Sequence, residues 1–275
     1  MPSLCASCET FSLDHPVVSS SEKKPEWLKK KNHVKEFIKT NTSFKARRPD
    51  YADQEVKISF GKDYAGRHVL YWAAESSSSL LVSDAKTAYD DFSNNGITTL
   101  DSKGNALIYL RCPQIYSTRE DGSSETKSFF RHFHMTLSTA KTKEWEDRVF
   151  TQLLIAKRSF LDLFRSLRSG HQITLNATCY KDEEENQMPW WEVLTSEQVK
   201  GMEKIELQRF IRKICHMNHP KLSVSLKLKK LHISEVPIIC YSFDPDYEDS
   251  PRLARELVDK GFLRVDILFS KRNNH

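Results

Sequence analysis

Apolar and polar residues alternate at short spacing through the first half of the chain, and this pattern is typical of β-strands. The predicted strands cover residues 56–60, 68–74, 106–112 and 129–137. Asn95-Gly96 and residues 103–105 are turn signals between them. Strands and turns at this spacing predict an antiparallel β-sandwich, with a short helix over residues 84–92.

Other stretches repeat apolar residues at the spacing of an α-helix. The longest runs from Lys143 to Ser169, ends before Gly170, and is predicted to connect the two halves of the chain. Residues 25–40 and 196–217 show the same spacing. Residues 222–233 alternate in a way that fits either a helix or a strand.

Residues 236–269 predict a strand, a loop, a helix and a second strand. Val236–Tyr241 is a continuous apolar run, which suits a strand covered on both faces. A polar loop follows, and Ser250-Pro251 is typical of a helix start. Gly261 is expected to end that helix in the left-handed conformation. In such a β-loop-α-β unit, ligands bind where the first strand's carboxyl end meets the helix N-terminus.

This segment resembles the active-site segment of the rhodanese (sulfurtransferase) family, which Cdc25-type phosphatases share. The matching residues, 238–265, are I-I-C-Y-S-F-D-P-D-Y-E-D-S-P-R-L-A-R-E-L-V-D-K-G-F-L-R-V. The resemblance implies an α/β fold with a parallel sheet, and a cysteine nucleophile directly after Tyr241. Ser242 stands at that position instead.

The loop after this strand carries four carboxylates, whereas the family holds an anionic sulfur donor or a persulfide there. The residues of this degenerate loop are Ser242, Asp244, Asp246, Glu248, Asp249 and Ser250. Like-charge repulsion opposes sulfur transfer, and a serine hydroxyl lacks the low pKa of a reactive thiol. Cys240 is the alternative thiol, since strand alternation places it on the same face as Ser242.

The fold class expected from these patterns is α+β overall, with an N-terminal antiparallel β-sandwich followed by a C-terminal α/β parallel-sheet domain of rhodanese type. The expected segments are a flexible arm (1–24), a basic helix plus β-sandwich domain (25–142), a connecting helix (143–169) and a rhodanese-like domain (170–275). A chain of 275 residues is long enough for two such domains.

Arg131-His132-Phe133-His134 is the second cluster with chemical potential. His132 and His134 share one face of a strand, at a spacing that metal sites use. With Tyr109 or Tyr116 upstream, the cluster resembles the two-Tyr, two-His iron site of intradiol dioxygenases, which also lies on a β-sandwich. Iron, zinc and a purely structural histidine pair therefore all remain open, and the favoured expectation is no cofactor.

The six cysteines are few for this length and are expected to be reduced, intracellular thiols. Cys5 and Cys8 have the spacing of half a zinc site. Cys215 and His219, four residues apart, are the candidate second half. Ordinary thiols are the simpler expectation for all of these cysteines.

The segment from Lys23 to Arg48 is strongly basic. Its candidate partner-binding residues are Lys29, Lys30, Lys31 and Lys35. A solvated helix face and a docking surface for nucleic acid or an acidic protein both fit this pattern. The net charge of +5 permits such partners without requiring one. No apolar run approaches eighteen residues, so no membrane association is expected.

These features favour a non-catalytic interaction or structural protein that binds a protein partner or a larger assembly. A β-sandwich joined to a rhodanese-like segment resembles proteins of large DNA viruses, which implies a place in the virion. Otherwise a cytoplasmic protein is expected. The alternative is an enzyme, either sulfurtransferase- or phosphatase-like through Cys240 or metal-dependent at His132 and His134.

Overall fold

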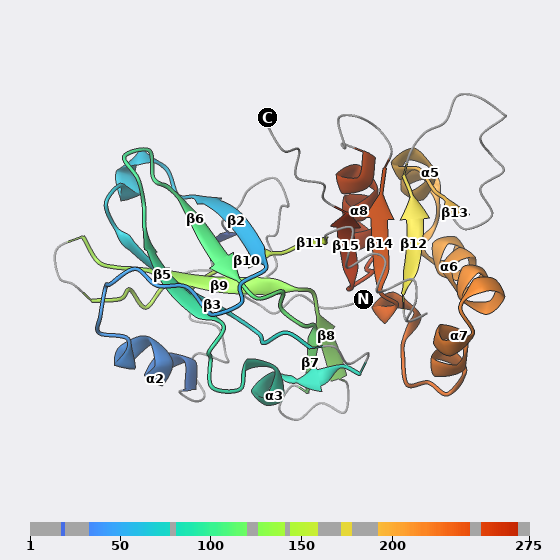
Figure 1. Ribbon diagram of the computed structural model, residues 1–275, viewed down its shortest axis with the longest axis horizontal. Helices are drawn as coiled ribbons and strands as arrows, with labels where there is room; N and C mark the ends of the chain where they lie inside the picture. Colours follow the sequence, from blue (N-terminus) through green and yellow to red (C-terminus); the bar gives the residue numbers. More distant parts are fainter. Residues whose placement is uncertain are drawn as a thin grey trace. The chain divides into compact units, whose positions relative to one another are not determined.

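The computed structural model describes residues 18–19, 33–77, 81–119, 126–140, 144–158, 172–177, 192–242 and 249–268. The chain divides into two compact units, a first unit of Pro2–Leu154 and a second unit of Ile155–His275. Figure 1 shows both, coloured along the sequence. The fold is mixed, with mainly antiparallel sheets in the first unit and a parallel sheet in the second.

The main sheet of the first unit has five strands in the order β1-β10-β9-β3-β5, and every neighbouring pair is antiparallel. Its strands are β1 (Val18–Ser19), β3 (His68–Ala73), β5 (Asn95–Thr99), β9 (His132–Leu137) and β10 (Phe150–Leu153). β3 and β9 are the central pair and are almost wholly buried, because both faces of this sheet are covered.

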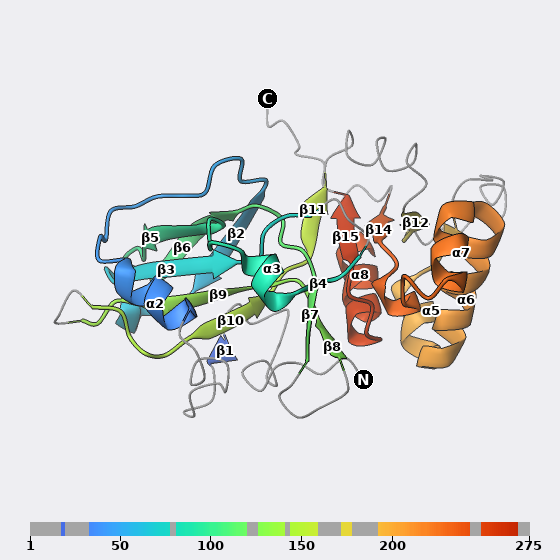
Figure 2. The same cartoon turned by 90° about the horizontal axis from the view of Figure 1, so that it is seen from below.

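One face of the main sheet packs against an antiparallel pair, β2 (Gln54–Ser59) and β6 (Asn105–Leu110), which Figure 2 shows from below. Their core contains Ile58 and Ile108 from the pair, and Val69, Phe133 and Met135 from the main sheet. Alternation along each strand therefore sends every second side chain into this core.

The other face of the main sheet is covered by α2 (His33–Thr40), whose Ile38 packs with Leu70 and Trp72. α3 (Ala85–Tyr89) follows Asp84, whose side chain accepts a hydrogen bond from the Thr87 N–H at 3.0 Å. Such a cap satisfies one of the free N–H groups at the start of a helix. Beside α3 lies a small sheet of β4 (Ser83–Asp84), β7 (Tyr116–Arg119) and β8 (Thr126–Phe129).

The second unit is built on a parallel sheet in the order β11-β15-β14-β12-β13. Its strands are β11 (Ala156–Arg158), β12 (Ile173–Asn176), β13 (Glu192–Val193), β14 (Ile238–Tyr241) and β15 (Val265–Leu268). Its helices are α5 (Ser196–Gly201), α6 (Lys204–Asn218), α7 (Pro220–Lys227) and α8 (Asp249–Asp259). α8 packs on β14 and β15, burying Leu253 and Leu257.

Several sequence predictions are confirmed. The alternating stretches form β2, β3, β6 and β9, the short helix forms α3, and residues 236–269 include the predicted strand, helix and second strand as β14, α8 and β15. Gly261 has φ of 91° at the end of α8, in the left-handed region expected of it. Residues 222–233, which fit either type, include the helix α7.

The predicted connecting helix is wrong over the residues that the structure describes. Phe150–Leu153 and Ala156–Arg158 are strands, and residues 159–169 of the predicted helix lie outside the described ranges. Val149 packs on the α2 side of the main sheet, and Phe150 packs on the opposite side. A strand that is covered on both faces has consecutive apolar residues. Such a run also fits the apolar face of a helix, so the pattern alone predicted the wrong element.

Two further sequence predictions also differ from the structure. Within the predicted flexible arm, Val18 and Ser19 pair with Thr151 and Phe150. The single helix predicted over residues 196–217 is broken between α5 and α6. Met202 there is extended, and Glu203 begins α6 through a capping box with Glu206. Over the described ranges, no helix combines the length and apolar character needed to cross a bilayer.

Candidate functional site

His132 and His134 lie on one face of β9, as their spacing predicts, and only 3% and 4% of their surfaces are exposed. Phe133, between them, points into the core on the opposite face. The ring of Trp72 lies 5.6 Å from the His134 ring, centroid to centroid. The histidine pair therefore occupies an aromatic, water-poor interior and not a surface.

Two tyrosines from other elements complete this cluster. Tyr116 on β7 places its hydroxyl 3.1 Å from His132 Nε2. Tyr89 on α3 places its hydroxyl 3.1 Å from His134 Nε2, 3.3 Å from His132 Nε2 and 3.5 Å from the Tyr116 hydroxyl. We refer to Tyr89, Tyr116, His132 and His134 as the Tyr–His cluster.

Nδ1 of each imidazole also has a hydrogen-bond partner. His132 Nδ1 lies 2.6 Å from the backbone oxygen of Phe130, which can only accept, so Nδ1 carries the proton. His134 Nδ1 lies 2.8 Å from the hydroxyl of Thr151 on β10. When Nδ1 of a neutral ring is protonated, Nε2 presents a lone pair, and in His132 that lone pair faces the two tyrosines.

Burial keeps both rings uncharged at neutral pH. Desolvation lowers the pKa of His132 to about 4, although the hydrogen bond to Phe130 acts in the opposite direction. Desolvation also lowers the pKa of His134 well below its ordinary value, and the neighbouring His132 adds to this shift. The cluster thus offers two neutral imidazoles and two phenols.

The sequence prediction for this cluster is correct in part. The structure brings His132 and His134 together with Tyr116, whereas Tyr109 lies on β6 with its ring 5.4 Å from the Arg48 guanidinium. Tyr89 was missed, although it ends the short helix predicted over residues 84–92. A helix position gives no signal that its side chain will meet a strand more than forty residues away.

Cys240, the alternative thiol, is fully buried in β14. Desolvation raises its pKa strongly, and the carboxylate of Asp266 raises it further. Asp266 itself accepts a hydrogen bond from Arg158 Nε at 2.9 Å, which joins β15 to β11. A thiol held in its neutral form is a poor nucleophile, so this position does not provide a reactive sulfur.

Ser242 directly follows β14, and 6% of its surface is exposed. Asp244, Asp246 and Glu248 lie outside the described residues. α8 begins at Asp249, two residues before Pro251, the first helical residue that the sequence predicts, so Ser250 is already helical and buried. The helix begins earlier than the Ser-Pro pair suggested because such signals fix a boundary only to within one or two residues.

The predicted joining of the two zinc halves stays a prediction, because Cys5 and Cys8 lie outside the described residues. Cys215 is buried in α6, and desolvation raises the pKa of its thiol to about 11. His219 ends the same helix, and partial burial lowers its pKa. Within the described ranges, no three or more His, Cys, Asp or Glu side chains are grouped to hold a metal ion.

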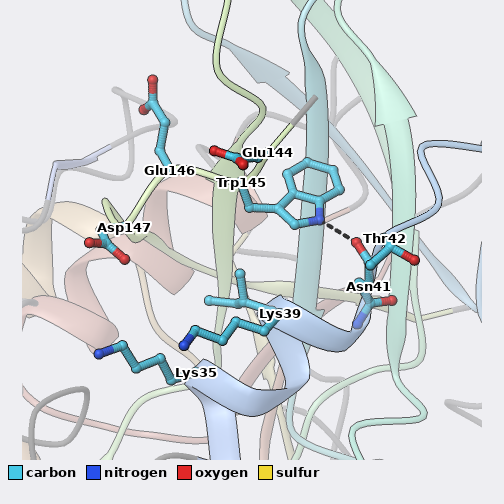
Figure 3. A pocket seen from close by; sticks show the side chains of 9 residues that line it. Lys35, Lys39, Asn41, Thr42, Glu144, Trp145, Glu146 and Asp147 are labelled. Carbon is cyan, nitrogen blue, oxygen red and sulfur yellow. Dashed lines mark hydrogen bonds between the residues drawn. The ribbon is translucent and has the colours of Figure 1, made fainter. Parts of the chain in front are cut away.

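A pocket of about 350 Å³ lies between α2 and residues 144–147. Figure 3 shows Trp145 in it, with its indole N–H donating to the Asn41 backbone oxygen at 2.5 Å. Lys35 and Lys39 come from α2, while Glu144, Glu146 and Asp147 bring carboxylates. Lys35 is the one candidate partner-binding lysine of the four within the described residues. Nucleic-acid binding by the other three stays a prediction.

Comparison with known proteins gives no family to which the chain can be assigned. No family model matches the sequence, and neither a curated protein nor a solved structure is detectably similar to it. The resemblance of residues 238–265 to rhodaneses therefore stays a prediction from the sequence.

Proposed function

We propose that this chain is a non-catalytic interaction or structural protein whose second unit is a degenerate rhodanese-like domain. The observation that carries this proposal is the state of Cys240 and Ser242. The thiol is fully buried with a raised pKa, and a hydroxyl stands where the family has its nucleophile. Neither group supplies the thiolate that sulfur transfer requires.

The arrangement of the second unit supports the rhodanese-like assignment. β12 leads to β13 on one side of the sheet, whereas β14 leads to β15 on the other. The carboxyl ends of β12 and β14 therefore form a topological switch point, where open α/β sheets bind their ligands. Ser242 follows β14 at this point, so the altered residue occupies the place where chemistry would be expected.

The first unit supports an interaction role through its architecture. The β2–β6 pair packs face to face on the main sheet around Ile58, Ile108 and Phe133, and we assign this arrangement to the β-sandwich class. Sandwich folds serve many functions, and binding of partner proteins is one of them. We propose that both units serve as docking surfaces in a larger assembly, and the resemblance stated above points to the virion of a large DNA virus.

A sulfurtransferase assay tests the proposal directly. We expect no cyanide-dependent production of thiocyanate from thiosulfate by the wild-type chain, and no persulfide on Cys240 by intact-mass measurement. The matched variant is Cys240→Ser. Thiocyanate production that this variant abolishes would overturn the proposal.

The buried thiol gives a second expected result. At pH 9 in native buffer, iodoacetamide should leave Cys240 unmodified, because desolvation keeps the raised pKa of this thiol well above that pH. In concentrated urea the same residue should alkylate readily. Peptide mapping by mass spectrometry reports Cys240 separately from the other cysteines. Fast modification in native buffer would contradict the buried, protonated thiol.

A further inference from the structure

The Tyr–His cluster places two phenol oxygens and two imidazole nitrogens close together in the interior. The four separations given above, three of which involve the Tyr89 hydroxyl, run from 3.1 to 3.5 Å. In a tetrahedral site with bonds of about 2.1 Å, neighbouring ligand atoms lie about 3.4 Å apart. The Tyr89 hydroxyl thus lies at ligand-to-ligand spacing from each of the other three atoms, and the Tyr116 hydroxyl lies at that spacing from His132 Nε2.

Hydrogen bonding alone requires less than this convergence. His132 Nε2 offers one lone pair, whereas either nitrogen of His134 can carry the proton, because its Nδ1 faces the Thr151 hydroxyl. Each phenol offers one proton. Tyr116 with His132, and Tyr89 with His134, would satisfy all four groups as two separate pairs. The Tyr89 hydroxyl nevertheless also lies within 3.3 Å of His132 Nε2 and 3.5 Å of the Tyr116 hydroxyl. These extra approaches bring the Tyr89 hydroxyl, the Tyr116 hydroxyl and His132 Nε2 mutually within 3.5 Å, with His134 Nε2 beside the Tyr89 hydroxyl.

The surroundings of the rings are those of metal-ligating histidines. Such residues usually bind a carbonyl, carboxylate or water through the other ring nitrogen, which fixes the tautomer and the ring plane. His132 Nδ1 is fixed by the Phe130 carbonyl, and His134 Nδ1 lies against the Thr151 hydroxyl. The rings of Trp72 and Phe129 pack on His134 and Tyr116, which limits rotation of the cluster.

We propose that Tyr89, Tyr116, His132 and His134 bind one divalent transition-metal ion of the zinc type. Two phenolates and two neutral imidazoles carry two negative charges, so a divalent ion makes the site neutral. A trivalent ion would leave a buried positive charge, which is costly. On binding, two phenol O–H bonds break and two metal–oxygen bonds form. Two protons leave to solvent, and no electrons are transferred.

Four protein ligands in a buried site are typical of a structural metal centre. The proposed ligands come from α3, β7 and β9, three elements that are well separated along the sequence. An ion there would join the small sheet and α3 to the main sheet of the first unit. This role does not depend on the function proposed for the second unit.

Zinc binding by the full-length chain tests the site. The measurement uses a Cys5→Ser, Cys8→Ser background, so that the other candidate zinc ligands do not contribute. After chelator treatment and dialysis against Zn²⁺, elemental analysis should give about one ion per chain. Zinc should raise the melting temperature by about 5 °C or more. Tyr89→Phe and Tyr116→Phe, which keep the ring packing, should each weaken zinc binding at least tenfold.

Tyr109→Phe is the matched control, because Tyr109 lies on β6 beside Arg48 and outside the cluster. It should bind zinc as the background chain does. Co²⁺ in place of zinc should give the absorption of a tetrahedral ion, lost in both cluster variants. The proposal fails if no ion binds or if the three tyrosine variants bind equally well. Retention of ferric iron in preference to zinc would overturn its charge assignment.

Discussion

Replacing Gly96 with alanine is expected to lower the free energy of unfolding of the first unit by about 3 kcal/mol. Gly96 lies in β5 directly opposite Tyr71 on β3. A methyl group at Gly96 would overlap the Tyr71 hydroxyl and approach the Arg47 backbone oxygen to 2.7 Å. The Tyr71 hydroxyl lies 3.4 Å from that same oxygen and 3.5 Å from the Tyr109 N–H, so it has little freedom to withdraw.

Calorimetric melting of the full chain measures this effect, since a loss of about 3 kcal/mol lowers the melting temperature by about 6–12 °C. Gly201→Ala is the control for added helix propensity, because a methyl group there meets no atom within 4 Å. Gly66→Ala separates backbone strain from overlap, because φ is 77° but the space is open. It should cost about 1 kcal/mol. A Gly96→Ala protein as stable as Gly201→Ala would contradict the packing of Tyr71.

Gly96 also shows what the sequence could not reveal. Asn-Gly is a strong local turn signal, and local pattern predicted a turn. The structure places the pair inside β5 because the large Tyr71 side chain needs a neighbour without a side chain. This requirement arises between residues more than twenty positions apart, so no short window of sequence contains it.

The elements that the sequence predicted well have a different character. β14 is a continuous apolar run, and β2 alternates between apolar and polar residues, so each carries its own evidence of burial. The prediction over β10 failed because a strand buried on both faces and an amphipathic helix can show the same pattern of apolar residues. In the candidate site, β9 revealed His132 and His134 through alternation, whereas Tyr89 joins them only through tertiary packing.

Replacing Asp266 with asparagine is expected to destabilise the second unit by about 2 kcal/mol. The carboxylate is 8% exposed and binds the Arg158 guanidinium, which is 26% exposed. The asparagine keeps the shape of the side chain but removes the negative charge that Asp266 places beside the Arg158 guanidinium. The interaction also joins two distant parts of the chain. Arg158 lies on the edge strand β11, and its neighbour in the sheet, β15, comes much later in the sequence.

A double-mutant cycle with Arg158→Met isolates this contribution. Urea unfolding of the two single variants and of the double variant should give a coupling energy of about 1–2 kcal/mol. Additive losses would show that the pair contributes no net stability.

The same Asp266→Asn protein also tests what suppresses the reactivity of Cys240. Removing the Asp266 charge takes away only the smaller cause of the raised thiol pKa, while desolvation remains. Cys240 should therefore stay unreactive at pH 9, whereas rapid alkylation would mean that the charge of Asp266, and not burial, suppresses this thiol.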